Sequence, residues 1–415
     1  MQKQFDNLYG ITPKSTDNPK AKQKQLFIEQ EQARILSELP TRPSNISFFE
    51  EILLKRDTAK ADKPLVGYFC NMVPAEIIHA MGAVPVRLDG GNNIAAITGE
   101  EILSGEICPV AKASFGIFLQ EDSLASSCDL LIIPTSCDAK RKMGEVLNDF
   151  KPTFMLNLPP EQNHRMYIKQ VYAEMKRLVE FLRQNLKVKL SKSALKKAID
   201  LGRAKSSLVR RLQELRSQDP RALSIRDLFL IVQASAFGIV SPERWIEETT
   251  KVLDELKNAE PPKKSLRPRL VLTGAPIIWP NFKVLNLLEE CGADIVADTV
   301  CTGAQSHFDP VVVEEKSMQS LLRALAGRYV FASICPCFIS QNTRINRILE
   351  LYESLSAGGV VNYSLRLCQL FDVENYRIGQ VMRERNIPFF NVRTDYSLED
   401  TEQLRVRIEA FLETL

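Results

Sequence analysis

The sequence predicts an α/β protein in which two Rossmann-like or flavodoxin-like parallel-sheet domains are joined by a helical insertion. Short apolar runs alternate with helix-like segments in two separate parts of the chain, which is the pattern of βαβ units. The part between them consists almost entirely of charged amphipathic stretches. A Pro-rich, charged segment at 258–265 marks the clearest boundary. The length, 415 residues, suits two or three domains.

The first half is expected to begin with an N-terminal helical segment over 1–60, followed by a first α/β domain over 61–160. Pro74 suits the first turn of a helix, and Gly82 ends that helix. The expected elements are an amphipathic helix over 21–39, strands over 64–70 and 84–88 around a helix over 74–81, and strands over 128–134 and near 156.

The second half is expected to contain a helical region over 161–262 and a second α/β domain over 263–415. The two α/β domains share one plan, but no close sequence repeat relates them. The expected helices are 171–182, 192–217, 243–257, 283–290 and 402–415, and the expected strands are 269–274, 293–297, 358–363 and 388–392.

Composition and missing motifs narrow the range of functions. The net charge of +3 demands neither nucleic acid nor an anionic membrane as partner. No apolar run approaches the roughly 20 residues of a membrane span, and the N-terminus lacks a signal peptide, so we expect a cytoplasmic protein. The sequence has no phosphate-binding GxxxxGK[ST] loop, so any ATP-driven step is expected on another protein.

The nine cysteines are the strongest functional signal. A lone free cysteine is most often a small buried hydrophobe. However, Cys70 closes a predicted strand, Cys301 and Cys368 come soon after others, and Cys108 precedes a predicted helix. Ligands of open α/β sheets collect at the carboxyl ends of strands, so these thiols could converge. The three histidines are dispersed, and soft thiolates with few histidines favour an iron–sulfur cluster over zinc.

Four segments make the chain resemble the 2-hydroxyacyl-CoA dehydratase/benzoyl-CoA reductase family. They are 66–85, which contains Cys70; 107–116, which contains Cys108; 135–143, which contains Cys137; and 405–413. The resemblance covers about 60–415. It implies that Cys70, Cys108 and Cys368 hold a [4Fe–4S] cluster with one iron open to a substrate or small ligand. It also implies an ATP-dependent iron–sulfur activator ATPase, which supplies single low-potential electrons that convert a thioester into a ketyl radical.

The C-terminal half is similar to one branch of that family, the double-cubane cluster proteins, in segments 300–303, 335–344 and 364–368. That resemblance implies a double-cubane [8Fe–9S] cluster, with a second set of ligands formed by Cys301, Cys337 and either Cys128 or Cys137. Cys335 is a spare candidate. The sequence departs from the branch at Ser123, where the branch usually has a cysteine.

The sequence leaves undecided the role of two further residues and the choice among several functions. Glu76 and His79 lie three residues apart on one helix, so they share a face. They could deliver protons to a bound substrate, although a helix-surface pair is the commoner arrangement. The chain could be a dehydratase subunit beside a similar subunit, a homodimeric reductase, a non-catalytic electron carrier or cluster scaffold, or a metabolite-binding protein without a cluster.

Overall fold

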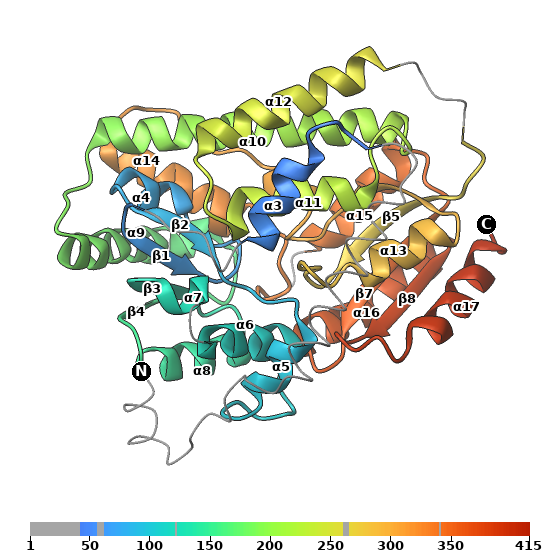
Figure 1. The fold of residues 1–415 in the computed structure, drawn as a ribbon, viewed down its shortest axis with the longest axis horizontal. Helices are drawn as coiled ribbons and strands as arrows, with labels where there is room; N and C mark the ends of the chain where they lie inside the picture. The colour runs from blue at the N-terminus through green and yellow to red at the C-terminus, as the bar shows by residue number, and fades with distance from the viewer. Residues whose placement is uncertain (1–41, 56–61, 121–122, 260–264, 340–341) are drawn as a thin grey trace.

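The computed structural model describes residues 42–55, 62–120, 123–259, 265–339 and 342–415 (Figure 1). The helix predicted over 21–39 lies outside the described residues. Of the N-terminal segment, the structure describes helix α3 (Ile46–Leu54), which packs against the helical region. Arg42, just before it, forms an ion pair of 2.6 Å with the buried Asp227.

The first sheet has four parallel strands in the order β2-β1-β3-β4. Its central strands β1 and β3 are buried along their whole length, as apolar runs in parallel sheets usually are. The strands are β1 (Leu65–Tyr68), β2 (Val84–Arg87), β3 (Leu130–Pro134) and β4 (Thr153–Leu156). The helices are α4 (Ala75–Ala80), α5 (Asn93–Gly99), α6 (Pro109–Leu119), α7 (Leu124–Ser127) and α8 (Asp138–Leu147).

The second sheet repeats this arrangement in the order β6-β5-β7-β8, again fully parallel. The predicted fold class of two parallel-sheet α/β units is therefore confirmed. The strands are β5 (Arg269–Gly274), β6 (Asp294–Asp298), β7 (Gly359–Leu365) and β8 (Phe389–Thr394). The helices are α13 (Lys283–Glu290), η2 (Ala304–His307), α14 (Met318–Ala326), η3 (Gly327–Phe331), α15 (Thr343–Ser354), α16 (Gln369–Glu384) and α17 (Thr401–Leu412).

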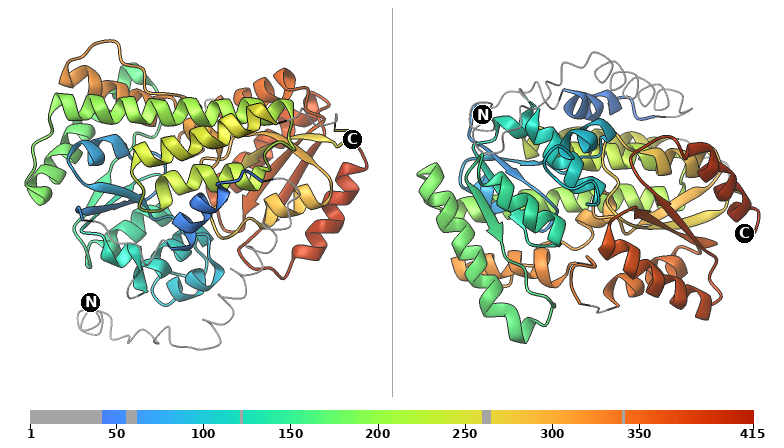
Figure 2. Two further views of the ribbon diagram at one scale, coloured as in Figure 1. Left: turned by 45° about the horizontal axis from the view of Figure 1, so that its top comes forward. Right: turned by 90° about the horizontal axis from the view of Figure 1, so that it is seen from below.

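Four helices connect the two sheets: α9 (His164–Leu186), α10 (Lys192–Gln218), α11 (Ile225–Phe237) and α12 (Pro242–Asn258). Helix α10 runs along α12, and both lie across one side of the molecule in Figure 2. Helix α11 is buried almost all round, as expected for a helix inside a core. One hydrophobic cluster includes α11 and residues of both sheets, so the two sheets share a core.

Polar contacts attach α11 to the second unit and join the second unit to the first. Gln233 donates to the Ile277 carbonyl at 2.8 Å and accepts from the Trp279 amide at 2.9 Å. The Tyr396 hydroxyl of the second unit donates to the Gly90 carbonyl of the first at 3.1 Å. Within the described part of the chain, no helix combines the length and the apolar character that a bilayer-spanning segment requires.

Candidate functional site

A cavity of about 90 Å³ lies between the two units, at the carboxyl ends of their strands. Open parallel sheets bind ligands at this edge, where the strand order reverses. Residues that follow β1, β3, β5, β6 and β7 line the cavity, so both sheets contribute to it. Six of its lining residues are cysteines: Cys70, Cys108, Cys137, Cys301, Cys335 and Cys368.

Cys70 lies two residues beyond the end of β1. Its backbone adopts a φ of +68°, which costs a residue with a side chain about 1–2 kcal/mol. Asp89, two residues beyond the end of β2, accepts a hydrogen bond from the Cys70 amide at 2.7 Å and so holds this conformation. The turn places the Cys70 thiol in the cavity lining.

Cys108 and Cys368 come from different units and contact each other through their thiols. Cys108 immediately precedes α6 and Cys368 immediately precedes α16. The Cys368 thiol donates to the Cys108 sulfur, and this bond, aided by amides at the start of α6, lowers the pKa of Cys108 to about 7. The same bond raises the pKa of Cys368 well above its usual range. Cys108 is therefore prepared for the thiolate form that binds metals.

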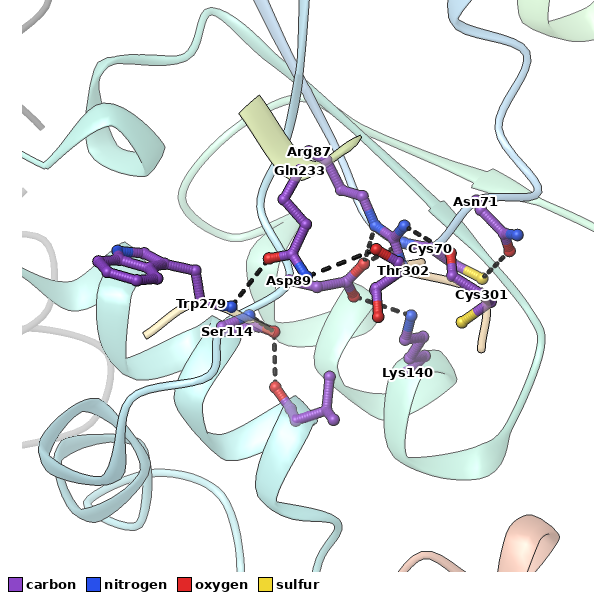
Figure 3. Close-up of polar contacts among 12 residues, drawn as sticks. Cys70, Asn71, Arg87, Asp89, Ser114, Lys140, Gln233, Trp279, Cys301 and Thr302 are labelled. Atoms are coloured by element: carbon purple, nitrogen blue, oxygen red, sulfur yellow. Dashed lines mark hydrogen bonds and ion pairs between the residues drawn. The ribbon is translucent and has the colours of Figure 1, made fainter. Parts of the chain in front are cut away.

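A buried carboxylate holds two cations at the cavity wall (Figure 3). Asp89 lies 2.6 Å from Arg87 Nε and 3.0 Å from Lys140 Nζ. Burial alone would raise the pKa of Asp89, but Lys140 and Arg87 outweigh it, and the pKa lies well below its usual range. One carboxylate between two cations leaves a net positive charge beside the thiols. This charge favours an anionic ligand in the cavity.

Cys301 lies in the loop after β6, beside Cys70 (Figure 3). Asp298, at the end of β6, accepts from the Val300 and Ala304 amides, at 3.0 Å each, and so shapes this loop. Arg87 Nη1 donates to the Cys301 carbonyl at 3.2 Å. Burial raises the pKa of the Cys301 thiol to about 11. A charge on this sulfur therefore needs a cation or a metal nearby.

The remaining thiols follow β3 and η3. Cys137 caps the start of α8, where its sulfur accepts from the Lys140 amide at 3.5 Å, and burial raises its pKa to about 11. The Cys337 thiol donates to the Cys335 sulfur, which lowers the pKa of Cys335. Cys335 lines the cavity, whereas Cys337, the predicted ligand, is not among its lining residues.

The structure does not bring Cys128 to the other thiols. Cys128 precedes β3 and therefore lies at the amino end of that strand, whereas the cavity lies at the carboxyl end. Its side chain is fully buried in the hydrophobic core, and its sulfur donates to the Leu124 carbonyl at 3.3 Å. Of the two alternatives that the sequence left open, Cys137 lines the cavity and Cys128 does not. Cys291 ends α13 and does not line the cavity.

A larger cavity of about 580 Å³ adjoins the cysteine-lined one. At its other end it reaches the surface beside the exposed residues Lys63, Lys197 and Glu243. Its volume lies in the range typical of small-molecule sites. Four residues line both cavities and form the wall between them: Asn71, Arg87, Arg328 and Tyr329.

Glu76 and His79, on α4, line the larger cavity and not the cysteine-lined one. The Tyr329 hydroxyl donates to Glu76 Oε2 at 2.8 Å. Burial raises the pKa of Glu76 and lowers the pKa of His79. Both shifts favour the neutral form of the side chain. Their role in proton delivery stays a prediction.

Sequence reasoning did not single out Asp89, Arg328 or Tyr329. Asp89 had a usable signal, because a carboxylate directly after an apolar strand lies at the ligand-binding edge. Arg328 and Tyr329 had none, since they lie in a π-helical turn that follows neither the helix nor the strand period.

The donor set fits an iron–sulfur cluster. Six thiols face one cavity, and Arg87 and Lys140 supply positive charge at its wall. Among the described residues, no three Cys, His, Asp or Glu side chains are close enough together to hold one metal ion. A cluster does not require such closeness, because each thiolate of a cubane binds a different iron.

Comparison with known proteins assigns the family. The family model of the 2-hydroxyglutaryl-CoA dehydratase D-component matches residues 70–415. The chain belongs to this family. The part of this chain that the family model matches begins at Cys70 and contains all six cysteines of the cavity lining. The family resemblance inferred from the sequence is therefore confirmed.

Several relatives of this chain are named as enzyme subunits. YjiM of Escherichia coli (strain K12), whose name as a dehydratase subunit is provisional, is 32% identical over 85% of this chain and 91% of its own length. The (R)-phenyllactyl-CoA dehydratase beta subunit of Clostridium sporogenes is 24% identical over 84% and 91%. A benzoyl-CoA reductase subunit from Thauera aromatica is 22% identical over 86% and 92%.

Proposed function

We propose that this chain is the iron–sulfur component of a 2-hydroxyacyl-CoA dehydratase-type lyase or reductase. The observation that carries the proposal is the meeting of six thiols, from two sheet units, around one positively charged cavity. When bound, the cluster would supply low-potential electrons to a substrate in the adjoining cavity.

Two sets of three thiols suit two cubanes. Cys70, Cys108 and Cys368 are the first set, as the family resemblance implies. The cavity lining supports Cys137, Cys301 and Cys335 as the second set, in which Cys335 takes the place expected of Cys337 and Cys137 that of Cys128. Six ligands would support a double-cubane [8Fe–9S] cluster, and three would support a single [4Fe–4S] cluster.

The larger cavity is the proposed site for the acyl part of a small thioester substrate. Names of the dehydratase and benzoyl-CoA reductase relatives point to acyl-CoA substrates. In this cavity, Glu76 and His79 would hold the protons that the reaction moves. A cavity of about 580 Å³ beside the thiols favours an enzyme component over a simple electron carrier, which needs no substrate site.

Two partners belong to this proposal. The chain has no phosphate-binding loop motif, so a separate ATP-dependent iron–sulfur ATPase would supply the electrons. The relatives are named as subunits, which supports pairing with a similar chain as a heterodimer or with a second copy as a homodimer.

Iron and acid-labile sulfide per chain, measured on protein purified without oxygen, test the cluster. About eight irons would support the double cubane, and about four would support the single cubane. Cys70→Ser and Cys368→Ser should lower the iron content, whereas Cys291→Ser, outside the cavity, is the matched control. Iron near zero in the reconstituted wild-type protein would refute the proposal.

A further inference from the structure

The wall between the two cavities is built on an unusual turn. Residues Gly327–Phe331 form a π-helical segment directly after α14. Such turns are rare and occur frequently at functional sites. Here the turn places two consecutive side chains, Arg328 and Tyr329, in the lining of both cavities.

Tyr329 joins the cysteine-lined cavity to a carboxyl group of the larger one. Its hydroxyl lies 2.8 Å from Glu76 Oε2. Tyr68, Arg328 and Lys205, from β1, η3 and α10, interact electrostatically with Glu76 from the other sides. Glu76 therefore lies in a mixed environment of two phenols and two cations.

Lys205, on α10, is a second proton-carrying group in the lining of the larger cavity, and α10 lies against Glu76, since a Cβ at Gly202 would come within 2.9 Å of Glu76 Oε1. Its Nζ donates to the Ser235 carbonyl at 3.0 Å and lies 5.4 Å from the centre of the Trp245 ring. His307, which stacks on Trp245, is half-buried, and desolvation holds its pKa well below its usual range. Burial lowers the pKa of Lys205 to about 8, against the attraction of Glu76. Lys205 can therefore release and regain a proton near neutral pH.

We propose that Lys205, Glu76 and Tyr329 form a proton relay that runs through the larger cavity to the wall of the cysteine-lined cavity. The inference deepens the proposed function and rests on it, because it assigns the path by which protons reach a ligand beside the thiols. Tyr329 is the group that touches this ligand, and Glu76 and Lys205 refill it.

The relay is a sequence of balanced proton transfers without change of oxidation state. The Tyr329 hydroxyl, which donates to Glu76 Oε2 in the ligand-free protein, turns toward the ligand, and its O–H bond breaks as its proton bonds to an acceptor oxygen or carbon of the ligand. The proton of the Glu76 carboxyl group then bonds to the Tyr329 oxygen, which leaves Glu76 as a carboxylate. The Lys205 ammonium returns a proton to Glu76 through water in the cavity, and solvent at the mouth reprotonates Lys205.

Titrations of the full-length protein separate a relay from a set of unrelated side chains. Infrared spectra across pH report the Glu76 carboxyl band, assigned from Glu76→Gln, and NMR of labelled lysine reports Lys205. In Tyr329→Phe, Glu76 loses the phenol hydrogen bond that favours its charged form, so it should bind its proton about tenfold more tightly. In Glu76→Gln, Lys205 should titrate at lower pH, because the attraction of the carboxylate is gone. Tyr376→Phe, on the exposed face of α16, should change neither titration.

Kinetics on the iron-loaded protein, supplied with a low-potential one-electron reductant in place of the proposed ATPase, complete the test, with (R)-2-hydroxyglutaryl-CoA and (R)-phenyllactyl-CoA as probes. Tyr329→Phe should lower kcat about 10²- to 10⁴-fold with little change in KM or iron content. An unchanged Glu76 titration in Tyr329→Phe, an unchanged Lys205 titration in Glu76→Gln, or an unchanged kcat would each overturn the relay. A wild-type protein that binds no iron would count against the proposed function instead, and the two titrations would still decide whether the three groups are coupled.

Discussion

Replacing Asp89 by asparagine tests the charged cluster at the cavity wall. The side chains of Asp89, Arg87 and Lys140 are only 1%, 5% and 13% exposed. Removing one partner of a buried ion pair leaves the other charge uncompensated and costs about 3–5 kcal/mol. Here the substitution removes the counter-charge of two cations, Arg87 and Lys140. It also weakens the hydrogen bond that the Cys70 amide donates to residue 89. At roughly 2 °C per kcal/mol for a large domain, Tm should fall by about 6–10 °C.

The pH dependence of this loss follows from the pKa of Asp89. Because the folded pKa lies well below the usual range, the carboxylate contributes fully to stability above the unfolded pKa of about 3.9. This contribution disappears only as the pH falls further, through the folded pKa. The difference in stability between Asp89→Asn and wild type should therefore be constant between about pH 5 and 8 and narrow below about pH 4.

Thermal unfolding of the metal-free protein, followed by circular dichroism at several pH values, measures both effects. The matched control is Glu145→Gln. Glu145 also pairs with a lysine, Lys142, at 2.7 Å, but both side chains are about 70% exposed. Exposed pairs contribute little to stability, so this variant should melt close to wild type. If Asp89→Asn melted together with Glu145→Gln, the buried cluster would not stabilise the cavity wall as argued.

Three more predictions follow from individual side chains. Cys128→Ser should destabilise the first unit, because the substitution buries a hydroxyl group in the hydrophobic core. The variant should nevertheless bind as much iron as wild type, and an iron loss equal to that of Cys70→Ser would contradict this. In metal-free protein at pH 7, an alkylating reagent should modify Cys108 well before Cys137, as followed by peptide mass mapping. The reason is that about half of Cys108, but only about 10⁻⁴ of Cys137, is in the thiolate form. Equal rates of modification would refute this order of the two pKa values. Gly91→Ala places a Cβ 2.0 Å from a carbonyl oxygen of the second unit, so both Tm and iron content should fall, whereas Gly105→Ala, whose Cβ comes no closer than 4.0 Å to its nearest neighbour, should resemble wild type.

The sheets were predictable because their physical signals are local. A parallel strand buried on both faces is a short apolar run, and the segments at 64–70, 128–134 and 269–274 all contain such strands. The sequence did not predict helix α11 as a separate helix, because a helix that is apolar on all sides shows no amphipathic period. The proposed domain boundaries stay a prediction.

The convergence of the thiols was predictable from the strand-end rule, and its exceptions have clear causes. Cys70, Cys301 and Cys368 follow strands and line the cavity. Cys128 precedes its strand, so it lies at the amino end of that strand and away from the edge where the carboxyl ends meet. The strand-end rule therefore does not place Cys128 in the cavity. The choice between Cys335 and Cys337 depends on which way an irregular loop turns, and spacing alone does not determine that.

The two cavities draw on different parts of the chain. All six thiols of the smaller cavity belong to the sheet units, whereas much of the larger cavity is lined by α10, α11 and the start of α12, a region without a single cysteine. The helical region therefore contributes to the larger cavity alone, whereas the sheet units line both cavities. Under the proposed function, substitutions in these helices would reshape the site for the acyl group without replacing any candidate cluster ligand. Exchange of 161–262 between relatives would then be a direct route to new specificities.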